Sequence, residues 1–174
     1  YLPWKFKNLD EIEKIINKYD IICLQELYCN FFQNNKKWLE NMSKKYRYNI
    51  IYDCKIDYPK FLGNDLAILS KYKINRYNLH LYNNAKYVDK FSNKGILTAN
   101  IQINDKKLNI HNTHMQAYYK KVNEILYPQI RELKAYVKNN FILTGDFNVN
   151  PYILKQFYDD KYFYISKNPT IYSL

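Results

Sequence analysis

Glycine is scarce in this sequence, with only three among 174 residues: Gly63, Gly95 and Gly145. Average usage is about 7%, so we expect each glycine to meet a backbone need, either a positive φ or the close approach of another segment. Gly145 separates an apolar run from Asp146, where a turn at a strand end would present the carboxylate. The alternative is that all three are ordinary turn glycines.

Cysteine and long apolar runs are scarce as well. Cys23, Cys29 and Cys54 form neither an even set nor a CxxC pair, which argues against a disulfide-stapled miniprotein and against a structural zinc site. We therefore expect free, buried thiols. No apolar run approaches the ~20 residues of a membrane-spanning helix, and no charged-then-apolar leader follows Tyr1. We expect no membrane-spanning segment, and secretion stays open.

Positive charge exceeds negative charge by 11, and 47% of the residues are apolar. The apolar content is sufficient for a chain of this length to bury a core as one domain. The excess of Lys and Arg favours anionic partners such as nucleic acid or acidic lipid headgroups. An A/T-rich coding bias, which would also raise Asn, Ile and Tyr, is the alternative cause of this charge.

Hydrophobic periodicity predicts a single α/β domain over residues 1–174. A capping box at Asn8 and Glu11, followed by apolar residues at helical spacing, predicts a helix over 9–18. The apolar run at 21–24 is typical of a strand buried on both faces. Pro128 is expected to end one helix and start another, or to kink a single one. The other expected elements are strands at 48–52, 66–70, 74–81, 95–103, 108–113 and 141–143, helices around 38–46 and over 122–137, and a weak helical tail at 152–164.

Polar side chains gather where the predicted strands end. Glu26, His114, Asp146 and Asn148 each follow such an end, and ligands collect outside the carboxyl ends of strands. A set rich in carboxylate and amide oxygens suits Mg²⁺, or alternatively Mn²⁺, rather than zinc. With His114 available to hydrogen-bond a phosphoryl oxygen, the combination indicates metal-assisted phosphoester hydrolysis.

Each of these residues also has a plainer interpretation. Glu26 alone could be a solvated acid at a strand end. Asp146 and Asn148 could stabilise a turn through side-chain bonds to the backbone. His80 lies inside a Tyr- and Leu-containing strand and is expected to be structural, and strand alternation should turn His111 away from the side that carries His114.

Five sequence blocks, taken together and in order, resemble the endonuclease/exonuclease/phosphatase superfamily, which has the DNase I-like fold. Two features, the Asn-Thr-His-Met-Gln-Ala block and the spacing from Asp89 to Lys94, are most similar to neutral sphingomyelinases. The blocks are Leu24-Gln25-Glu26, Leu66-Ala67-Ile68-Leu69-Ser70-Lys71, Lys94-Gly95, Asn112-Thr113-His114-Met115-Gln116-Ala117 and Gly145-Asp146-Phe147-Asn148.

The resemblance implies an α/β fold, a four-layer sandwich of two packed β-sheets flanked by helices. It also implies that residues 1–174 are an incomplete domain. The Asn-bearing first strand of the family is absent, and so is the C-terminal Asp-His pair whose His acts as general base, because no histidine follows His114. We therefore expect the parent protein to be the enzyme and this chain alone to be inactive.

The resemblance also implies site roles. The metal ligand would be Glu26, holding Mg²⁺ or Mn²⁺. The catalytic residues would be His114 on the phosphoryl group, Asp146 orienting the histidine or the attacking water, and Asn148 holding a phosphate oxygen. The substrate-binding residues would be Asp89, Lys94 and Asn112. Two pairs of large side chains, Phe61-Leu62 and Tyr118-Tyr119, could form an apolar or aromatic rim that dips into a membrane surface; the alternative is ordinary packing under loops.

The implied activity is Mg²⁺-dependent hydrolysis of sphingomyelin, or of another phospholipid headgroup at a membrane surface, to ceramide and phosphocholine. One alternative is a nuclease of the same superfamily acting on nucleic acid, which the charge favours. A non-enzymatic alternative is a truncated member that binds anionic lipid or nucleic acid, which the missing histidine favours. No obligate protein partner is inferred. A sphingomyelinase would be secreted or membrane-associated, and the sequence does not decide the compartment.

Overall fold

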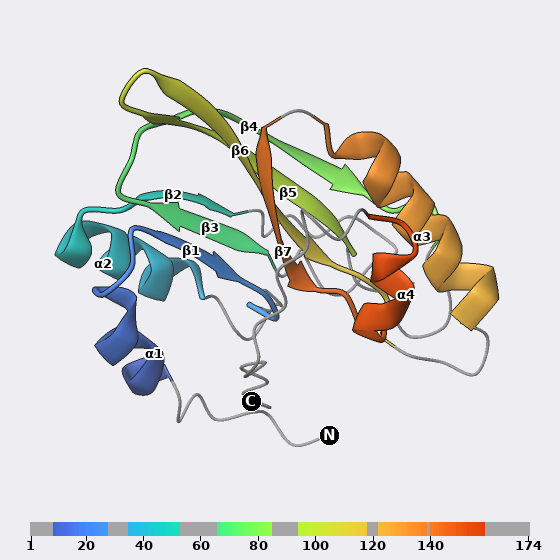
Figure 1. Ribbon diagram of the computed structural model, residues 1–174. Helices are drawn as coiled ribbons and strands as arrows, with labels where there is room; N and C mark the ends of the chain where they lie inside the picture. Colours follow the sequence, from blue (N-terminus) through green and yellow to red (C-terminus); the bar gives the residue numbers. More distant parts are fainter. Residues whose placement is uncertain are drawn as a thin grey trace.

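Two β-sheets form the centre of the computed structural model, which describes residues 9–27, 35–52, 66–84, 94–117, 122–138 and 140–158 (Figure 1). The smaller sheet has the strand order β1-β3-β2 and is antiparallel. The larger has the order β4-β5-β6-β7, in which only β7 runs parallel to its neighbour. The strands are β1 (Ile21–Leu24), β2 (Asn49–Tyr52), β3 (Ala67–Ser70), β4 (Ile74–Leu81), β5 (Gly95–Ile103), β6 (Lys106–His114) and β7 (Phe141–Asp146).

The described helices flank these sheets in two pairs. They are α1 (Leu9–Ile16), α2 (Lys36–Tyr46), α3 (Val122–Tyr136) and α4 (Pro151–Lys155). Helix α2 ends at Arg47, which adopts a left-handed conformation and donates its backbone N–H to the Ser43 carbonyl. Helix α4 begins where the Asn150 side chain accepts the backbone N–H of Tyr152, with proline in the first turn.

Three apolar clusters hold the layers together. Leu39 of α2 packs in the same cluster as Leu69 of β3, on the outer face of the smaller sheet. Ile68 of β3 and Leu97 of β5 belong to the cluster between the sheets. The third cluster lies under α3 and α4 and includes Leu133. The result is the expected four-layer arrangement of helices, sheet, sheet and helices (Figure 1).

The predicted strands and helices are confirmed within the described residues, with changes at several boundaries. Asn8 of the predicted capping box and residues 159–164 of the predicted tail lie outside the described residues. Strand β1 is only partly buried, because β3 is its single strand neighbour among the described residues. The strand buried on both faces is β3, which pairs on each side. Pro128 lies inside one continuous helix, α3. Strands β6 and β7 extend to His114 and Asp146, so these two residues end strands instead of following them.

Two glycines allow close approach between neighbouring strands. Gly145 has a φ of 143°, and a Cβ there would lie 2.0 Å from the Thr113 carbonyl oxygen. A Cβ at Gly95 would lie 2.3 Å from the His80 carbonyl oxygen. The prediction that glycine serves the backbone is confirmed at both positions, and Gly63 lies outside the described residues.

Candidate active site

The buried part of the candidate site is a Lys–His pair at the end of the larger sheet. His114 ends β6, and its ring is almost fully buried. The Nζ atom of Lys94 lies 2.8 Å from His114 Nε2 and 3.1 Å from Nδ1, and Lys94 is also buried. An ammonium group only donates hydrogen bonds, so a ring nitrogen of His114 accepts from it. The pair therefore brings a positive charge to the strand end.

Asp146 lies opposite His114 in the register between β6 and β7. Its Oδ2 atom is 4.0 Å from His114 Nε2, which is beyond hydrogen-bond distance. The carboxylate is exposed at the strand end, whereas the histidine is buried. The strand ends therefore combine a buried cationic donor with an exposed carboxylate.

Asn148 follows β7 in a tight turn with a φ of 49°. Its backbone N–H donates to Asp146 Oδ1 at 2.9 Å, which is the side-chain turn expected as the plainer interpretation. Its side-chain amide donates to the Met115 carbonyl at 3.0 Å, directly after His114. Asn148 thus forms the turn with Asp146 and also lies next to the residue that follows His114.

Asn112 joins the smaller sheet to the larger one. It is fully buried, and its Nδ2 atom donates to the carbonyl oxygens of Leu24 at 2.8 Å and Ala67 at 3.0 Å. Its Oδ1 atom accepts from Gln25 Nε2 at 2.5 Å. These bonds bring the end of β1 beside β6, two residues before His114. The substrate-binding role expected of Asn112 stays a prediction.

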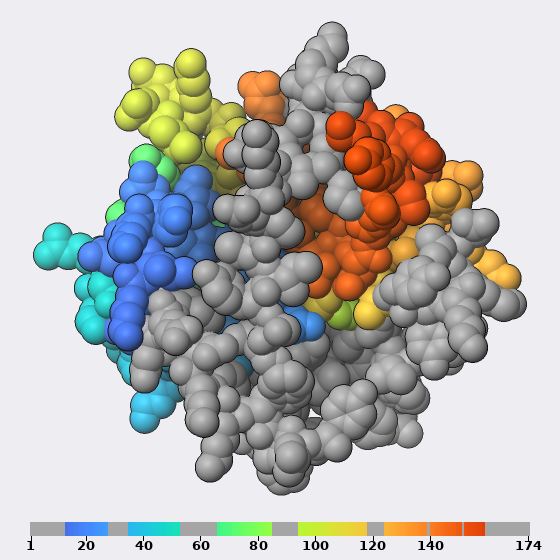
Figure 2. Space-filling view, turned by 60° about the horizontal axis from the view of Figure 1, so that its bottom comes forward, coloured from blue at the N-terminus to red at the C-terminus, as the bar shows by residue number. Residues whose placement is uncertain are grey.

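Glu26 directly follows Gln25 and is exposed, with a φ of 60°. The bonds of Asn112 therefore bring the Glu26 backbone to the sheet end that carries His114. Figure 2 shows this side of the molecule, where blue residues of the α1–β1 region and orange residues of β7 and α4 both reach the surface. An unusual backbone conformation at a non-glycine residue is often associated with functional sites.

The residues present determine which metal would fit. Within the described ranges, no three His, Cys, Asp or Glu side chains gather closely enough to form a metal cluster. Zinc sites need three or four such ligands. Mg²⁺ keeps several waters and uses one or two carboxylates. A single exposed carboxylate such as Glu26 is compatible with the few protein ligands that Mg²⁺ takes, and its role as the metal ligand stays a prediction.

The two other histidines lie on the opposite face of the larger sheet. His80 Nε2 lies 2.7 Å from Glu132 Oε1, and its ring stacks on Tyr136. His111 packs edge-on against Tyr136 and Phe141. Both sequence predictions, a structural His80 and a His111 that faces away from His114, are confirmed.

The side-chain contacts of two glutamines, the partly buried Gln25 and the buried Gln129, have no role in the sequence prediction. Gln25 was only part of a motif, although its side chain reaches Asn112. Gln129 is fully buried, accepts the Gln116 N–H at 3.0 Å and donates to the Asn84 carbonyl at 2.5 Å. The sequence feature that could have indicated a buried role for Gln129 is its position as a polar residue on the apolar face of α3.

Several predicted positions lie outside the described residues. They are Asp89, Cys29, Cys54, Phe61-Leu62 and Tyr118-Tyr119. Among the described residues, no helix is both long and apolar enough to cross a bilayer.

The chain is similar in sequence to curated proteins from two organisms. The chain is 27% identical over 192 residues to a sphingomyelinase of Dictyostelium discoideum, an alignment that covers 86% of this chain and 41% of the relative. It is 26% identical over 176 residues to a phospholipase C of Staphylococcus aureus, covering 86% of this chain and 53% of the relative. The chain thus spans about half or less of the length of these relatives.

A solved structure confirms the fold. The β toxin of Staphylococcus aureus, in a mutant crystallised with bound magnesium ions, superposes with a TM-score of 0.67 at 20% identity, covering 87% of this chain and 63% of the toxin. Residues 5–152 match the Endonuclease/Exonuclease/phosphatase family. Since the match covers most of the chain, the protein belongs to the endonuclease/exonuclease/phosphatase family.

Proposed function

We propose that this chain is part of a Mg²⁺-dependent phosphodiesterase that hydrolyses sphingomyelin to ceramide and phosphocholine. The observation that carries the proposal is the Lys94–His114 pair at the end of β6, beside the exposed Asp146 carboxylate. Family membership supports phosphoester chemistry, and the similarity to a sphingomyelinase and a phospholipase C supports a phospholipid substrate.

The substrate's phosphodiester has negatively charged oxygens that must be stabilised while a water attacks. Lys94 and His114 would bind a phosphoryl oxygen, where a fixed cation stabilises developing negative charge. Asp146 would accept a hydrogen bond from the attacking water, or from His114 Nε2, 4.0 Å away, in the tautomer in which Nδ1 is the atom that accepts from Lys94. Asn148 would donate its second amide N–H to the phosphate, since the first already serves Met115. Mg²⁺, held by Glu26, would supply further charge neutralisation.

We further propose that residues 1–174 form a single, incomplete domain, and that the full-length protein supplies an Asn-bearing first strand and a C-terminal Asp-His pair. General-base catalysis is worth roughly 10²–10⁴-fold, and His80 and His111 lie on the other face of the sheet. The chain alone is therefore expected to be nearly inactive. Asp89 would bind substrate together with Lys94, and Asn112 would support substrate binding by holding the end of β1 beside β6.

The test is sphingomyelin hydrolysis by the full-length protein with and without Mg²⁺. Glu26→Gln and His114→Gln should each lower kcat at least about 10²-fold without changing the circular dichroism spectrum. The matched controls are Glu40→Gln on α2 and His80→Gln, whose ring lies on the opposite face of the larger sheet from His114 and stacks on Tyr136. Near-normal activity of Glu26→Gln at saturating Mg²⁺ would remove Glu26 from the metal site.

A nuclease is the second candidate, because the net charge is +11. Nucleic-acid binding that neutralises several phosphates weakens steeply with log[salt], whereas vesicle binding through apolar burial does not. Mg²⁺-dependent DNA cleavage, combined with steeply salt-dependent DNA binding and no sphingomyelin turnover, would replace the lipid proposal with the nuclease.

A further inference from the structure

A polar pocket lies on the outer face of the larger sheet, away from the candidate active site. It has a volume of about 260 Å³ and is lined by nine residues of β4, β5, β6 and the segment at the end of α3. His111 lines this pocket, whereas its neighbour Asn112 points between the sheets. The pocket and the active-site residues therefore lie on opposite faces of β6.

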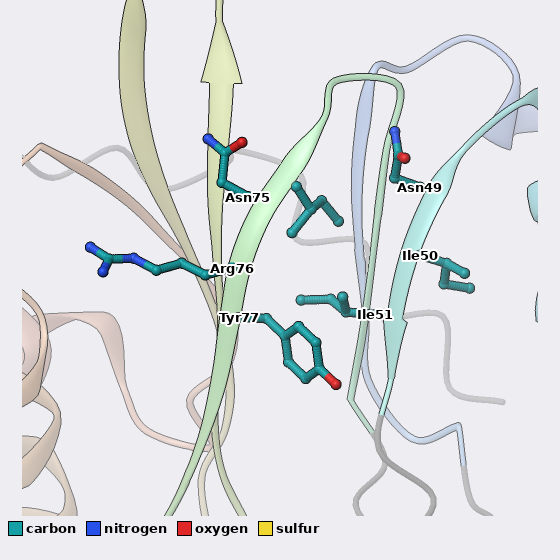
Figure 3. Close-up of a pocket in the computed structure, with 7 residues that line it drawn as sticks. Asn49, Ile50, Ile51, Asn75, Arg76 and Tyr77 are labelled. Atoms are coloured by element: carbon teal, nitrogen blue, oxygen red, sulfur yellow. The ribbon is translucent and has the colours of Figure 1, made fainter.

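The pocket has two cations and no acid. Arg76 and Lys138 line it, and none of its nine described lining residues is Asp or Glu. Both side chains are exposed, and neither forms an ion pair among the described residues. Arg76 and Tyr77 line both this pocket and a neighbouring one between β2 and β4. Figure 3 shows their side chains on opposite sides of β4, with Tyr77 on the side of Ile51. Arg76 is thus directed to the outer face.

The hydrogen bonds around the pocket leave donors available. Asn78 Nδ2 donates to Tyr136 Oη at 2.7 Å, so the Tyr136 hydroxyl keeps its own hydrogen for another acceptor. Asn100 Nδ2 donates to Asn109 Oδ1 at 2.9 Å, which leaves the Asn109 amide nitrogen as a donor. The Tyr136 hydroxyl and the Asn109 amide can therefore donate hydrogen bonds to a ligand that carries several acceptor atoms.

His111 adds a buried group with no partner. Only 3% of the residue is exposed, its Nδ1 atom lies 2.8 Å from Thr98 Oγ1, and its Nε2 atom has no hydrogen-bond partner. A buried, unpaired ring nitrogen is costly. Burial lowers the pKa of His111 to about 4, so the ring is neutral at pH 7. If Thr98 donates to Nδ1, Nε2 carries the hydrogen and is a further donor.

We propose that this pocket binds a phosphate group, with Arg76 and Lys138 as its charged contacts. Guanidinium groups bind phosphate oxygens in pairs, and an ammonium supplies a point charge. The small volume suits a phosphate or a phosphorylated headgroup better than a large ligand. The phosphate source is either a soluble phosphate compound or the headgroup of an anionic lipid.

The test is a titration of the full-length protein with inorganic phosphate, monitored by NMR of the histidine rings. Saturable shifts of the His111 ring signals are expected. Arg76→Gln/Lys138→Gln should weaken this response at least tenfold. The control Lys73→Gln/Lys134→Gln removes the same charge from exposed positions outside the pocket and should leave the response unchanged. Shifts at His114 alone, or equal weakening in both double variants, would overturn the proposal.

Vesicles then separate the two phosphate sources. Cosedimentation with phosphatidylcholine vesicles containing phosphatidic acid, compared with pure phosphatidylcholine, reports on headgroup binding. Binding that needs phosphatidic acid and is lost only in Arg76→Gln/Lys138→Gln identifies the lipid headgroup. Binding of inorganic phosphate at His111 without any gain from phosphatidic acid identifies a soluble phosphate compound.

Discussion

The Asn112 side chain donates a hydrogen bond to the Leu24 carbonyl oxygen, 88 residues earlier in the chain, at 2.8 Å. The same amide group donates to Ala67, and both bonds cross from the larger sheet to the smaller one. These contacts fix the end of β1, and with it the Glu26 backbone, beside β6. A single buried amide therefore links the two halves of the candidate site.

Replacing Asn112 should destabilise the fold. Asn112→Ala would remove the side-chain partner of two carbonyl oxygens and of the Gln25 amide; the bond to Ala67 is buried and the other two are partly buried. Each unsatisfied group costs about 1–3 kcal/mol, so we expect the free energy of unfolding to fall by about 3 kcal/mol in urea titrations. Asn78→Ala, on an exposed side chain, is the control and should cost less than about 1 kcal/mol. Equal losses in the two variants would contradict this interpretation.

Gly145→Ala should separate β7 from β6. The added Cβ would lie 2.0 Å from the Thr113 carbonyl oxygen, in a backbone conformation that L-residues rarely adopt. Because the strand must move, we expect a loss of about 3 kcal/mol or more, together with reduced activity through displacement of Asp146. Differential scanning calorimetry would compare the melting temperature of Gly145→Ala with that of Thr144→Ala, a substitution at the neighbouring position. A melting temperature equal to that of Thr144→Ala would show that β7 accommodates the methyl group.

Strands and helices were predictable because apolar periodicity reports directly on burial. The unusual backbone conformation of Gly145, which lies inside β7, was also predictable locally, because few residues other than glycine adopt its φ of 143°. The Lys94 contact on His114 and the Gln25 contact on Asn112 were not, because each joins segments that are distant in sequence or on different sheets. The incomplete burial of β1 also depends on which strands pair with it, which a local pattern does not report.

The stability of the fold should fall in mild acid partly because of His111. Burial lowers its pKa from 6.5 to about 4, so between these values the unfolded chain binds the proton and the folded chain does not. The contribution of His111 is therefore complete above pH 6.5 and is lost as the pH falls towards 4, at up to about 1.4 kcal/mol per pH unit. His111→Gln should show a smaller decrease in urea midpoint from pH 7 to pH 5 than the wild type. Equal decreases in the urea midpoint of the wild type and of His111→Gln would show that His111 does not contribute to the loss of stability in acid.

Cys23 should resist alkylation in the folded protein. Burial raises the pKa of its thiol to about 12, and the thiolate is the reactive form. At pH 8 we expect iodoacetamide to modify the Cys23 peptide at least 100-fold more slowly in native buffer than in 8 M urea, as measured by mass spectrometry. Comparable rates in the two conditions would show that β1 opens readily.

Lys94 should contribute to catalysis through its charge. Lys94→Gln keeps a polar side chain but removes the ammonium that lies 2.8 Å from His114 Nε2. Loss of one fixed donor that stabilises developing charge costs about 10²–10³-fold in kcat, and we expect that decrease in sphingomyelin hydrolysis by the full-length protein.

Two further variants distinguish this charge effect from a general one. Lys107→Gln removes an exposed charge at the far end of β6 and should leave kcat unchanged. Lys94→Arg should rescue little activity, because a planar guanidinium does not replace a compact ammonium in a buried position. A KM increase with unchanged kcat in Lys94→Gln would instead assign Lys94 to binding of the ground-state substrate.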